Sequence, residues 1–317
     1  MEFKENEILA HHTTFKIGGP ARLYAEAKTA ADLAEAVTRA EQERLPLFVF
    51  SGGSNILFSD KGFPGLVVRI AISGIRANED GIVSVGAGEK LLDLVAATCD
   101  AGLSGMERLS GVPGSVGGAV RGNAGAFGTE TGEHISSVKV FDRKTGEVKE
   151  FGREDCRFGY RTSRFKEDPD LLILSVEFRL SPGHDPESLR ATATEIRNAR
   201  EEKHPQDVFS AGSFFMNPVV SDPELREEFT KDAGKPPKDE RLPAGWLIDQ
   251  VGLRGKTIGH AKISEMHPNY ILNTGGATAE DVLMLVSIVK QKIRDELDVQ
   301  MQPEVQFVGF GMEKPFS

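Results

Sequence analysis

Cysteine is scarce in the sequence, which contains only Cys99 and Cys156. Two thiols cannot form the framework of several disulfides that stabilises small secreted domains, so we expect both to be reduced and structural. The seven histidines form no H-E-x-x-H pattern, and the cysteines show no metal-ligand spacing. No metal site is therefore expected.

Long apolar runs are also missing, because no stretch approaches the roughly 18 residues of a membrane span. The N-terminal segment MEFKENE is too acidic for the basic start of a secretory signal. These two observations predict a cytoplasmic protein without membrane insertion.

Basic residues are outnumbered, since 38 Lys and Arg against 48 Asp and Glu give a formal net charge of -10. This balance argues against a nucleic-acid partner, because a phosphate backbone binds a basic face. A small anionic ligand remains possible, since it requires only a local cluster of cations.

The chain does contain enough residues, 317 with 39% hydrophobic and 27% charged, for a globular protein of about two domains. The segment SPGHDP at 181–186 has two prolines, a glycine and no apolar residue, which is typical of a boundary. We expect domains at residues 1–185 and 186–302, with a strand in 303–317 completing the first.

Two helices have clear start signals, in which a threonine cap is followed three residues later by an aspartate. Thr29 precedes the first of them, which ends before Pro46, and Thr278 precedes the second, which ends near Leu297. The charged, proline-rich segment 221–243 predicts an exposed insertion. The other expected elements are strands at 47–50, 66–70, 82–85, 138–141 and 171–180, helices at 91–102 and 187–203, and one or two closing strands within 299–310.

A first glycine cluster, SGGSN at 51–55, follows directly after a predicted strand. Successive glycines at such a point let backbone N–H groups surround a phosphate. The order is not G-x-G-x-x-G leading into a long helix, so a Rossmann nucleotide site is disfavoured. An ordinary tight turn is the alternative interpretation.

A second cluster, GVPGSVGGAVRGNAGAFG at 111–128, is so rich in glycine that no regular helix or central strand is expected there. Two loops with exposed backbone in one domain favour a single long ligand with a diphosphate, such as a dinucleotide cofactor. A pair of crossed loops that pack closely explains the same glycines.

Three polar residues attract attention but do not define a function individually. Ser213 in SAGSFFMNP lacks the G-x-S-x-G setting of a serine nucleophile. Arg161 in YRTS suits a planar carboxylate or enolate, although a surface arginine is the simpler interpretation. Glu304 follows Pro303 and shares a strand face with Gln306, where a solvated edge glutamate is the default.

The order of these segments carries more information than any one of them. TTFKIGGPA, SGGSNILFSDKGFPG, GVPGSVGGAVRGNAGAFG, YRTSRF, SAGSFFMNP, AGWLIDQVGLRGKTIGHAKISEMHPNYILNTGGATAEDV and PEVQFVG span nearly the whole chain. In this order they resemble the UDP-N-acetylenolpyruvoylglucosamine reductase (MurB) family, flavoenzymes of peptidoglycan precursor synthesis. Because the chain lacks the extra tyrosine-bearing loop of one branch, it is similar to the shorter type II enzymes.

The resemblance implies an α+β fold, with an FAD-binding domain of the PCMH or vanillyl-alcohol-oxidase type and a smaller α+β substrate-binding domain. It also implies a monomer. The residues that match the family's cofactor contacts are Gly52, Gly53, Ser54, Asn55, Gly114, Ser115, Gly118 and Asn123.

The implied reaction begins with reduction of FAD by NADPH, which then leaves. The enolpyruvyl ether of UDP-N-acetylglucosamine next takes a hydride from flavin N5 at its vinyl carbon. By resemblance, Ser213 donates the proton, while Arg161 and Glu304 stabilise the enolate. The residues that match substrate contacts are Tyr160, Lys203, Asn217, Arg254 and His267.

Two departures from the family pattern lie beside the cofactor loops. Ser51 stands where the family often has another glycine, and Arg121-Gly122 replaces a commonly hydrophobic pair. Three rival functions remain: another FAD oxidoreductase such as an alcohol oxidase, a serine hydrolase built on Ser213, and a non-catalytic flavin-binding or nucleotide-binding module.

Overall fold

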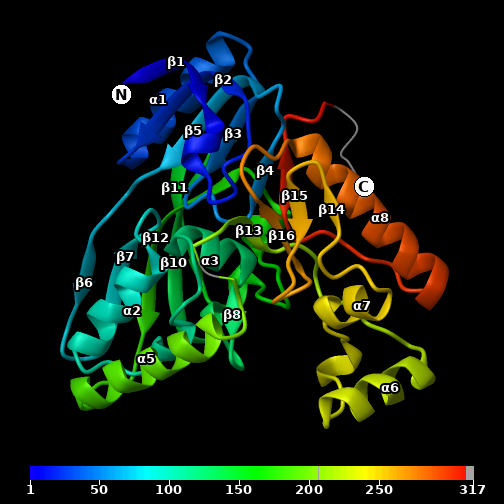
Figure 1. The fold of residues 1–317 in the computed structure, drawn as a ribbon. Helices are drawn as coiled ribbons and strands as arrows, with labels where there is room; N and C mark the ends of the chain where they lie inside the picture. The colour runs from blue at the N-terminus through cyan, green and yellow to red at the C-terminus, as the bar shows by residue number, and fades with distance from the viewer. Residues whose placement is uncertain (206, 312–317) are drawn as a thin grey trace. The chain divides into compact units, whose positions relative to one another are not determined.

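The computed structural model describes residues 1–205 and 207–311 (Figure 1). These residues form two compact units, each with its own hydrophobic core. The first unit contains Met1–Glu7, Ala21–Gly52 and Pro64–Glu202. The second contains the described residues of Ile8–Pro20, Gly53–Phe63 and Lys203–Ser317.

The units divide the chain at other places than the expected boundary at 185/186. Two short segments, Ile8–Pro20 and Gly53–Phe63, leave the first unit and belong to the second. The described part of 303–317 also belongs to the second unit rather than the first. The boundaries of independently folding domains stay a prediction.

The first unit contains two larger sheets, the small antiparallel pair of β8 with β9, and several helices. One sheet has the strand order β1-β2-β5-β3, and the other has the order β11-β10-β12-β7-β6. The elements are β1 (Phe3–Ile8), β2 (Pro20–Ala27), α1 (Ala30–Gln42), β3 (Leu47–Phe50), β5 (Phe63–Ile70), β6 (Ile75–Ala77), β7 (Ile82–Gly86), α2 (Leu91–Asp100), α3 (Val116–Gly122), β8 (Gly125–Ala126), β9 (Thr129–Glu130), β10 (Ile135–Asp142), β11 (Glu147–Gly152), α4 (Arg164–Glu167), β12 (Leu171–Arg179) and α5 (Pro186–Glu201).

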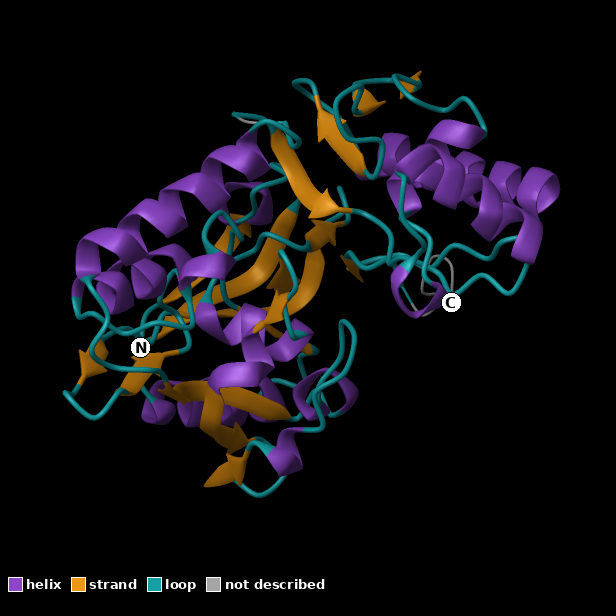
Figure 2. Cartoon of the chain, turned by 90° about the horizontal axis from the view of Figure 1, so that it is seen from below, coloured by secondary structure: helices purple, strands orange, loops and turns teal. Residues whose placement is uncertain are grey.

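The second unit contains a four-stranded antiparallel sheet in the order β13-β16-β15-β14 and a parallel pair of β17 with β4. Its elements are β4 (Ile56–Phe58), β13 (Phe209–Ser213), α6 (Pro223–Ala233), α7 (Ala244–Gln250), β14 (Thr257–Ile258), β15 (Ala261–Ile263), β16 (Tyr270–Asn273), α8 (Ala279–Leu297) and β17 (Gln306–Val308). Helices and strands are mixed in both units (Figure 2), so the α+β class is confirmed.

Helix α8 confirms the prediction from its start signal. Thr278 Oγ1 accepts from Asp281 N at 3.1 Å, and the Asp281 carboxylate accepts from Thr278 N at 3.1 Å, so the two residues satisfy each other's backbone donors. Asp60, which follows β4 closely in the chain, accepts from Ala279 N at 2.8 Å. The apolar stripe of the helix, Val282, Leu285, Val286, Val289 and Ile293, is fully buried.

Helix α1 begins in the same way, with Thr29 and Asp32 forming a capping box. Helices α2 and α5 and strands β3, β5, β7, β10 and β12 also lie where the sequence predicts them. Helix α5 ends at Glu201 rather than Lys203. The expected closing strands reduce to β17, which pairs in parallel with β4.

The prediction that no helix forms within 111–128 is wrong, because α3 occupies Val116–Gly122. Ser115 caps this helix by accepting from Gly118 N at 3.2 Å. A Cβ on Gly117 would lie 2.9 Å from the Cβ of Ala87. Glycine here permits the helix to approach the β7 end closely, and burial of Val116 and Val120 offsets its poor helix propensity.

The segment 221–243 is also more ordered than an exposed insertion. It contains α6, which is capped by Asp222 and ended by Gly234 at φ 68°. Leu225 and Phe229 from α6 are buried, and the Phe229 ring meets the Trp246 ring edge-on at 5.4 Å. The prediction is therefore wrong for this face of the helix.

Among the helices that the structure describes, none is both long and apolar enough to cross a membrane.

Replacing Thr278 by alanine should lower the free energy of unfolding by about 1 kcal/mol, because the Asp281 N–H loses its cap. Urea denaturation followed by circular dichroism measures the change. Ser287→Ala is the matched control, since the Ser287 hydroxyl donates to Leu283 O within the same helix and alanine has the higher helix propensity. Equal losses in both variants would contradict the role of the cap.

Candidate active site

The predicted site residues divide between the two units. The first unit contains Gly52, Gly114, Ser115, Gly118, Asn123, Tyr160 and Arg161. The second unit contains Gly53, Ser54, Asn55, Lys203, Ser213, Asn217, Arg254, His267 and Glu304.

Ser213 is the last residue of β13, where it pairs with Tyr270 of β16. The register of this pairing shifts between Ser210 and Ser213, and Gly212 has φ 75°. A bulge of this kind re-aims the side chain that follows it. Glycine is needed at 212 because the left-handed backbone region disfavours residues with a Cβ.

The two aromatic residues after Ser213 anchor it to the core. Phe214 is fully buried and Phe215 nearly so, with their rings 5.4 Å apart. The Phe214 ring also meets the Phe307 ring of β17 edge-on at 6.1 Å. The half-buried Ser213 is therefore attached to a rigid part of the second unit.

Glu304 lies beside the same segment. Its N–H donates to Phe214 O at 2.8 Å, and its own carbonyl accepts from Asn55 Nδ2 at 3.2 Å. The chain then returns to Asn55, whose carbonyl accepts from Gln306 N at 3.0 Å. The second unit thus brings together three predicted site residues, Ser213, Glu304 and Asn55, through bonds to the main chain.

Arg161 sits at the tip of a tight turn in the first unit. Gly159 and Thr162 close this turn with two reciprocal backbone hydrogen bonds of 3.1 and 3.2 Å. The Arg161 backbone has φ 56°, a region that costs a residue with a Cβ about 1–2 kcal/mol. Its guanidinium donates to Gly125 O at 3.1 Å and lies 5.3 Å from the centre of the Tyr160 ring.

Asn123 fixes the position of this turn. Its side chain is buried, and its Nδ2 donates both to Gly159 O at 3.0 Å and to Glu130 Oε2 at 2.7 Å. Its Oδ1 accepts from Gly132 N at 2.9 Å. Both amide donors of Asn123 are used by the protein, so a cofactor contact at this residue would have to come from its main chain or its second acceptor position.

The glycine loops of the first unit meet backbone to backbone. Gly52 N donates to Ser115 Oγ at 3.2 Å, and a Cβ on Gly52 would lie 2.7 Å from Ser115 N. Close packing of the loops accounts for Gly52. It does not account for Gly118, which is exposed and whose Cβ would meet only Ser115 Oγ at 3.3 Å. The residues therefore fit a ligand that runs over the exposed face of α3.

Gly53 begins the part of the loop that belongs to the second unit. It has φ 66°, and a Cβ there would lie 2.2 Å from His12 O, so the turn requires glycine.

Ser51 and Arg121 are residues at which the sequence departs from the family pattern. The Ser51 hydroxyl donates to Ile70 O at 3.1 Å and to Ala87 O at 3.3 Å. Burial lowers the pKa of the Arg121 guanidinium. The main-chain carbonyl of Arg121 accepts a hydrogen bond from Ser163 Oγ at 2.7 Å.

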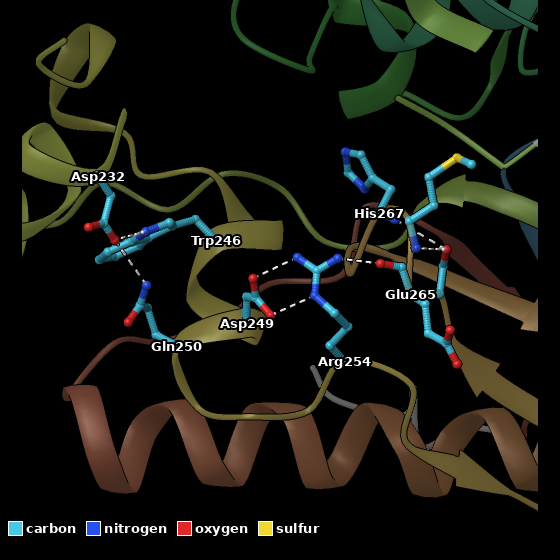
Figure 3. Close-up of polar contacts among 9 residues, drawn as sticks. Asp232, Trp246, Asp249, Gln250, Arg254, Glu265 and His267 are labelled. Atoms are coloured by element: carbon cyan, nitrogen blue, oxygen red, sulfur yellow. Dashed lines mark hydrogen bonds and ion pairs between the residues drawn. The ribbon is translucent and has the colours of Figure 1, made fainter. Parts of the chain in front are cut away.

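Arg254 is engaged by protein groups (Figure 3). Its Nε and Nη2 donate to the two carboxylate oxygens of Asp249 at 2.7 and 2.6 Å, and its Nη1 donates to Glu265 O. The hydrogen bonds between the two side chains lower the pKa of Asp249 and raise that of Arg254. An anion that binds Arg254 therefore has to share the positive charge of the guanidinium with the Asp249 carboxylate.

The other predicted substrate residues have different surroundings. Asn217 Oδ1 accepts from Ala244 N at 2.9 Å at the start of α7. The His267 ring stacks on His204 at 4.7 Å and meets Tyr270 at 5.0 Å. Lys203 is exposed after α5.

Two residues that shape the site were not singled out by the sequence. Asn269 bonds both main-chain groups of Phe215, and Glu130 accepts from Asn123. Asn269 lies within the long matching segment 244–282, but nothing there indicates its bonds to Phe215, and Glu130 lies outside the matching segments. Only the three-dimensional structure identifies them.

Both cysteines are buried free thiols, as expected from their number. Burial raises the pKa of Cys99 and of Cys156 to about 11. At neutral pH such thiols stay protonated, which suits a structural role.

Residues 21–152 match the model of an FAD binding domain, and they include all eight predicted cofactor residues. The chain is thus a flavoprotein that binds FAD. Residues 204–308 match the C-terminal domain of UDP-N-acetylenolpyruvoylglucosamine reductase.

Proteins named UDP-N-acetylenolpyruvoylglucosamine reductase are similar over almost the whole chain. The protein from Solibacter usitatus is 36% identical over 95% of this chain and 95% of its own length. The one from Parasynechococcus marenigrum is 36% identical over 98% and 97%. The crystal structure of the MurB enzyme from Thermus caldophilus has a TM-score of 0.76 and 32% identity, covering 97% of this chain and 100% of that one.

The chain therefore belongs to the UDP-N-acetylenolpyruvoylglucosamine reductase (MurB) family of FAD-dependent oxidoreductases. Family membership confirms the resemblance and the arrangement of an FAD-binding domain followed by the family's C-terminal domain.

Replacing Asn123 by alanine should lower the free energy of unfolding by about 1–3 kcal/mol, because Gly132 N and Gly159 O lose a buried partner. Chemical denaturation of the FAD-free and FAD-loaded protein measures the loss. Asn78→Ala is the control, since Asn78 Oδ1 accepts from Ile82 N at 2.9 Å in an exposed turn. The control should lose roughly 1 kcal/mol or less, and a larger loss there would contradict the argument from burial.

The ion pair of Asp249 with Arg254 should contribute to stability at neutral pH and lose that contribution in acid. Because the folded pKa of Asp249 is lowered, its contribution is complete above the unfolded value of about 3.9 and disappears as the pH falls through the folded value. Both side chains are about two-fifths exposed, at 40% and 41%, which limits the effect to roughly 0.2–1 kcal/mol.

Asp249→Asn should therefore lose stability at pH 7, and the loss should shrink progressively as the pH falls below about 4, as measured by urea midpoints. Arg254→Ala should remove the same pH-dependent part. An equal loss at both pH values would contradict a role for the charge.

Proposed function

We propose that the protein catalyses the NADPH-dependent reduction of UDP-N-acetylglucosamine enolpyruvate to UDP-N-acetylmuramate. The observation that carries this proposal is that two family-matched residues, Ser213 and Glu304, lie close together. Glu304 N donates to the carbonyl of Phe214, the residue that follows Ser213, at 2.8 Å. Membership of the family supplies the reaction class. The product belongs to peptidoglycan precursor synthesis, and hence to cell-wall growth and division.

When bound, FAD accepts two electrons from NADPH and passes them on as a hydride to the terminal vinyl carbon of the substrate. Addition of a hydride there leaves negative charge on the neighbouring carbon and its carboxylate. A proton must then reach that carbon, so that two new C–H bonds replace the π bond and a C–C single bond remains. The protein has to stabilise the charge and supply the proton.

Ser213 is proposed to supply this proton from Oγ to the carbon beside the carboxylate. A serine hydroxyl is a weak acid, so the transfer depends on a short, fixed approach. The bulge at Gly212 and the buried Phe214 and Phe215 support such rigidity. General acid catalysis of this type is worth about 10²–10⁴ in rate.

Arg161 and Glu304 are proposed to stabilise the enolate. The guanidinium is always charged and planar, which suits a delocalised carboxylate. The turn at 159–162 fixes the backbone position from which the Arg161 side chain extends. Electrostatic stabilisation of developing charge usually contributes more to catalysis than any other single effect. Glu304, held through its backbone N–H and its carbonyl, is proposed to share a hydrogen bond with the intermediate.

The substrate's diphosphate and carboxylate are proposed to bind Tyr160, Lys203, Asn217, Arg254 and His267. Arg254 uses three donor atoms on Asp249 and Glu265, so it would act as a charge that is already oriented rather than as a mobile side chain. A local cation of this kind lets a chain of net charge -10 hold an anion.

The FAD contacts are proposed to come from Gly52, Gly53, Ser54 and Asn55 in one loop, and from Gly114, Ser115, Gly118 and Asn123 in the other. The close approach of the loops at Gly52 and the exposed face at Gly118 support this set. We further propose a monomer of the type II branch. A cytoplasmic location is proposed because nucleotide sugars and NADPH are intracellular metabolites.

The test separates the two half-reactions in a stopped-flow instrument. The purified protein should be yellow, NADPH should bleach the flavin, and the enolpyruvyl UDP-sugar should restore the colour with formation of the reduced product. Steady NADPH oxidation that ignores the UDP-sugar would instead indicate an oxidase. Labelling of Ser213 by a fluorophosphonate would indicate a hydrolase.

Ser213→Ala should leave the NADPH half-reaction intact and slow the second by about 10²–10⁴-fold. Unchanged flavin absorption and thermal stability serve as controls that the variant is folded and loaded. A second half-reaction at the wild-type rate would refute Ser213 as the proton donor.

A further inference from the structure

Asn269 lies directly before β16, and its buried side chain is 4% exposed. Its Nδ2 donates to Phe215 O at 2.9 Å, and its Oδ1 accepts from Phe215 N at 2.9 Å. The carbonyl of Asn269 also accepts from Phe214 N at 2.7 Å. One residue therefore bonds three main-chain polar groups of the two residues that follow Ser213.

These bonds are needed because Phe214 and Phe215 are buried, where unpaired main-chain groups are costly. A carboxamide is suited to the task, since it offers a donor and an acceptor side by side. The donor and acceptor of Phe215 also fix which way the amide is oriented. A shorter hydroxyl side chain cannot reach both groups.

The segment that Asn269 holds connects the two proposed reaction residues of the second unit. Ser213 precedes Phe214 and pairs with Tyr270, the residue after Asn269. Phe214 O accepts from Glu304 N at 2.8 Å, and Phe215 forms a bridge with Pro303. Movement of Phe214 or Phe215 would thus displace Ser213 and Glu304 together.

We propose that Asn269 is a positioning residue for the reduction, which fixes Ser213 and Glu304 relative to one another through Phe214 and Phe215. The proposal rests on the proposed function, because it assigns Asn269 no contact with the substrate. It predicts an effect on proton transfer and charge stabilisation, and none on the reduction of FAD by NADPH.

Asn273 offers a matched control at the other end of β16. It is also buried, at 7%, and its amide donates to Phe15 O at 3.1 Å and accepts from Gly275 N at 2.9 Å and Ala277 N at 3.0 Å. Its hydrogen bonds equal those of Asn269 in kind, but they serve another part of the unit. A purely structural role predicts equal effects for the two residues.

The experiment compares the FAD-loaded full chain with Asn269→Ser, Asn273→Ser, Ser213→Ala and the double variant Ser213→Ala/Asn269→Ser. Stopped-flow traces give both half-reactions, and thermal melts give stability. Because a misplacement of about 1 Å can cost about 10²-fold, Asn269→Ser should slow the second half-reaction by about that factor. Flavin reduction by NADPH should stay near the wild-type rate.

The control Asn273→Ser should lose stability but keep the second half-reaction. The double variant should be slowed by less than the product of the two single losses, because the part of the Asn269 effect that passes through Ser213 is already lost and only the part that passes through Glu304 remains. Equal slowing in the two asparagine variants, or a loss that multiplies in the double variant, would overturn the proposal. Should Asn269→Ser fail to fold, Asn269→Gln is measured against the same expectations, since its longer side chain displaces Phe215.

The two proposals fail in different ways. A Ser213→Ala variant that is slow, with an Asn269→Ser variant at the wild-type rate, refutes the positioning role alone. A Ser213→Ala variant at the wild-type rate refutes the proton donor, and the positioning role with it.

Discussion

The hydrogen bond from Glu304 N to Phe214 O holds together segments that lie far apart in the sequence. On one side of it stands β13 with Ser213, and on the other the residues that lead into β17. Asn55 is joined to the same segment, because its Nδ2 donates to the Glu304 carbonyl at 3.2 Å. The second unit is therefore organised around a main-chain connection, and the side chains that carry chemistry depend on it.

The first unit solves a similar problem with a side chain instead of a backbone bond. Asn123 closes α3, supports the turn that carries Arg161 and binds Gly132. In both units a buried asparagine amide pairs with the backbone next to a proposed reaction residue. An amide can do this because it satisfies donors and acceptors without introducing a charge into the core.

Features that depend on local patterns were predictable from the sequence. The caps at Thr29 and Thr278 identified α1 and α8, because a capping box is contained within four residues. The glycines of 111–128 were recognised as unusual, but their effect was misjudged: Gly117 allows a helix to approach Ala87, and this contact is invisible without the sheet. The charge of 221–243 likewise concealed the buried face of α6.

The proposed site residues came from the order of motifs, whereas the hydrogen bonds that support them could not be predicted in this way. Asn269 and Phe215 are 54 positions apart, and nothing in either local sequence announces the pairing. Arg254 was identified as a cation, but its partner Asp249 was not, since five residues across a turn fit no helical spacing. The sequence thus predicted candidate chemical groups, which stay a prediction, and it did not predict the hydrogen bonds that position them.

The left-handed backbone at Arg161 sets folding and chemistry against one another. Glycine would adopt that conformation at no steric cost, so selection for thermal stability alone would favour the loss of arginine. With Arg161 in its proposed role, a laboratory evolution experiment that screened only for heat resistance would drift toward a well-folded flavoprotein with an impaired reaction. The conformation of Arg161 thus gives its proposed role in the reaction a cost in folding stability that a glycine at this position would avoid.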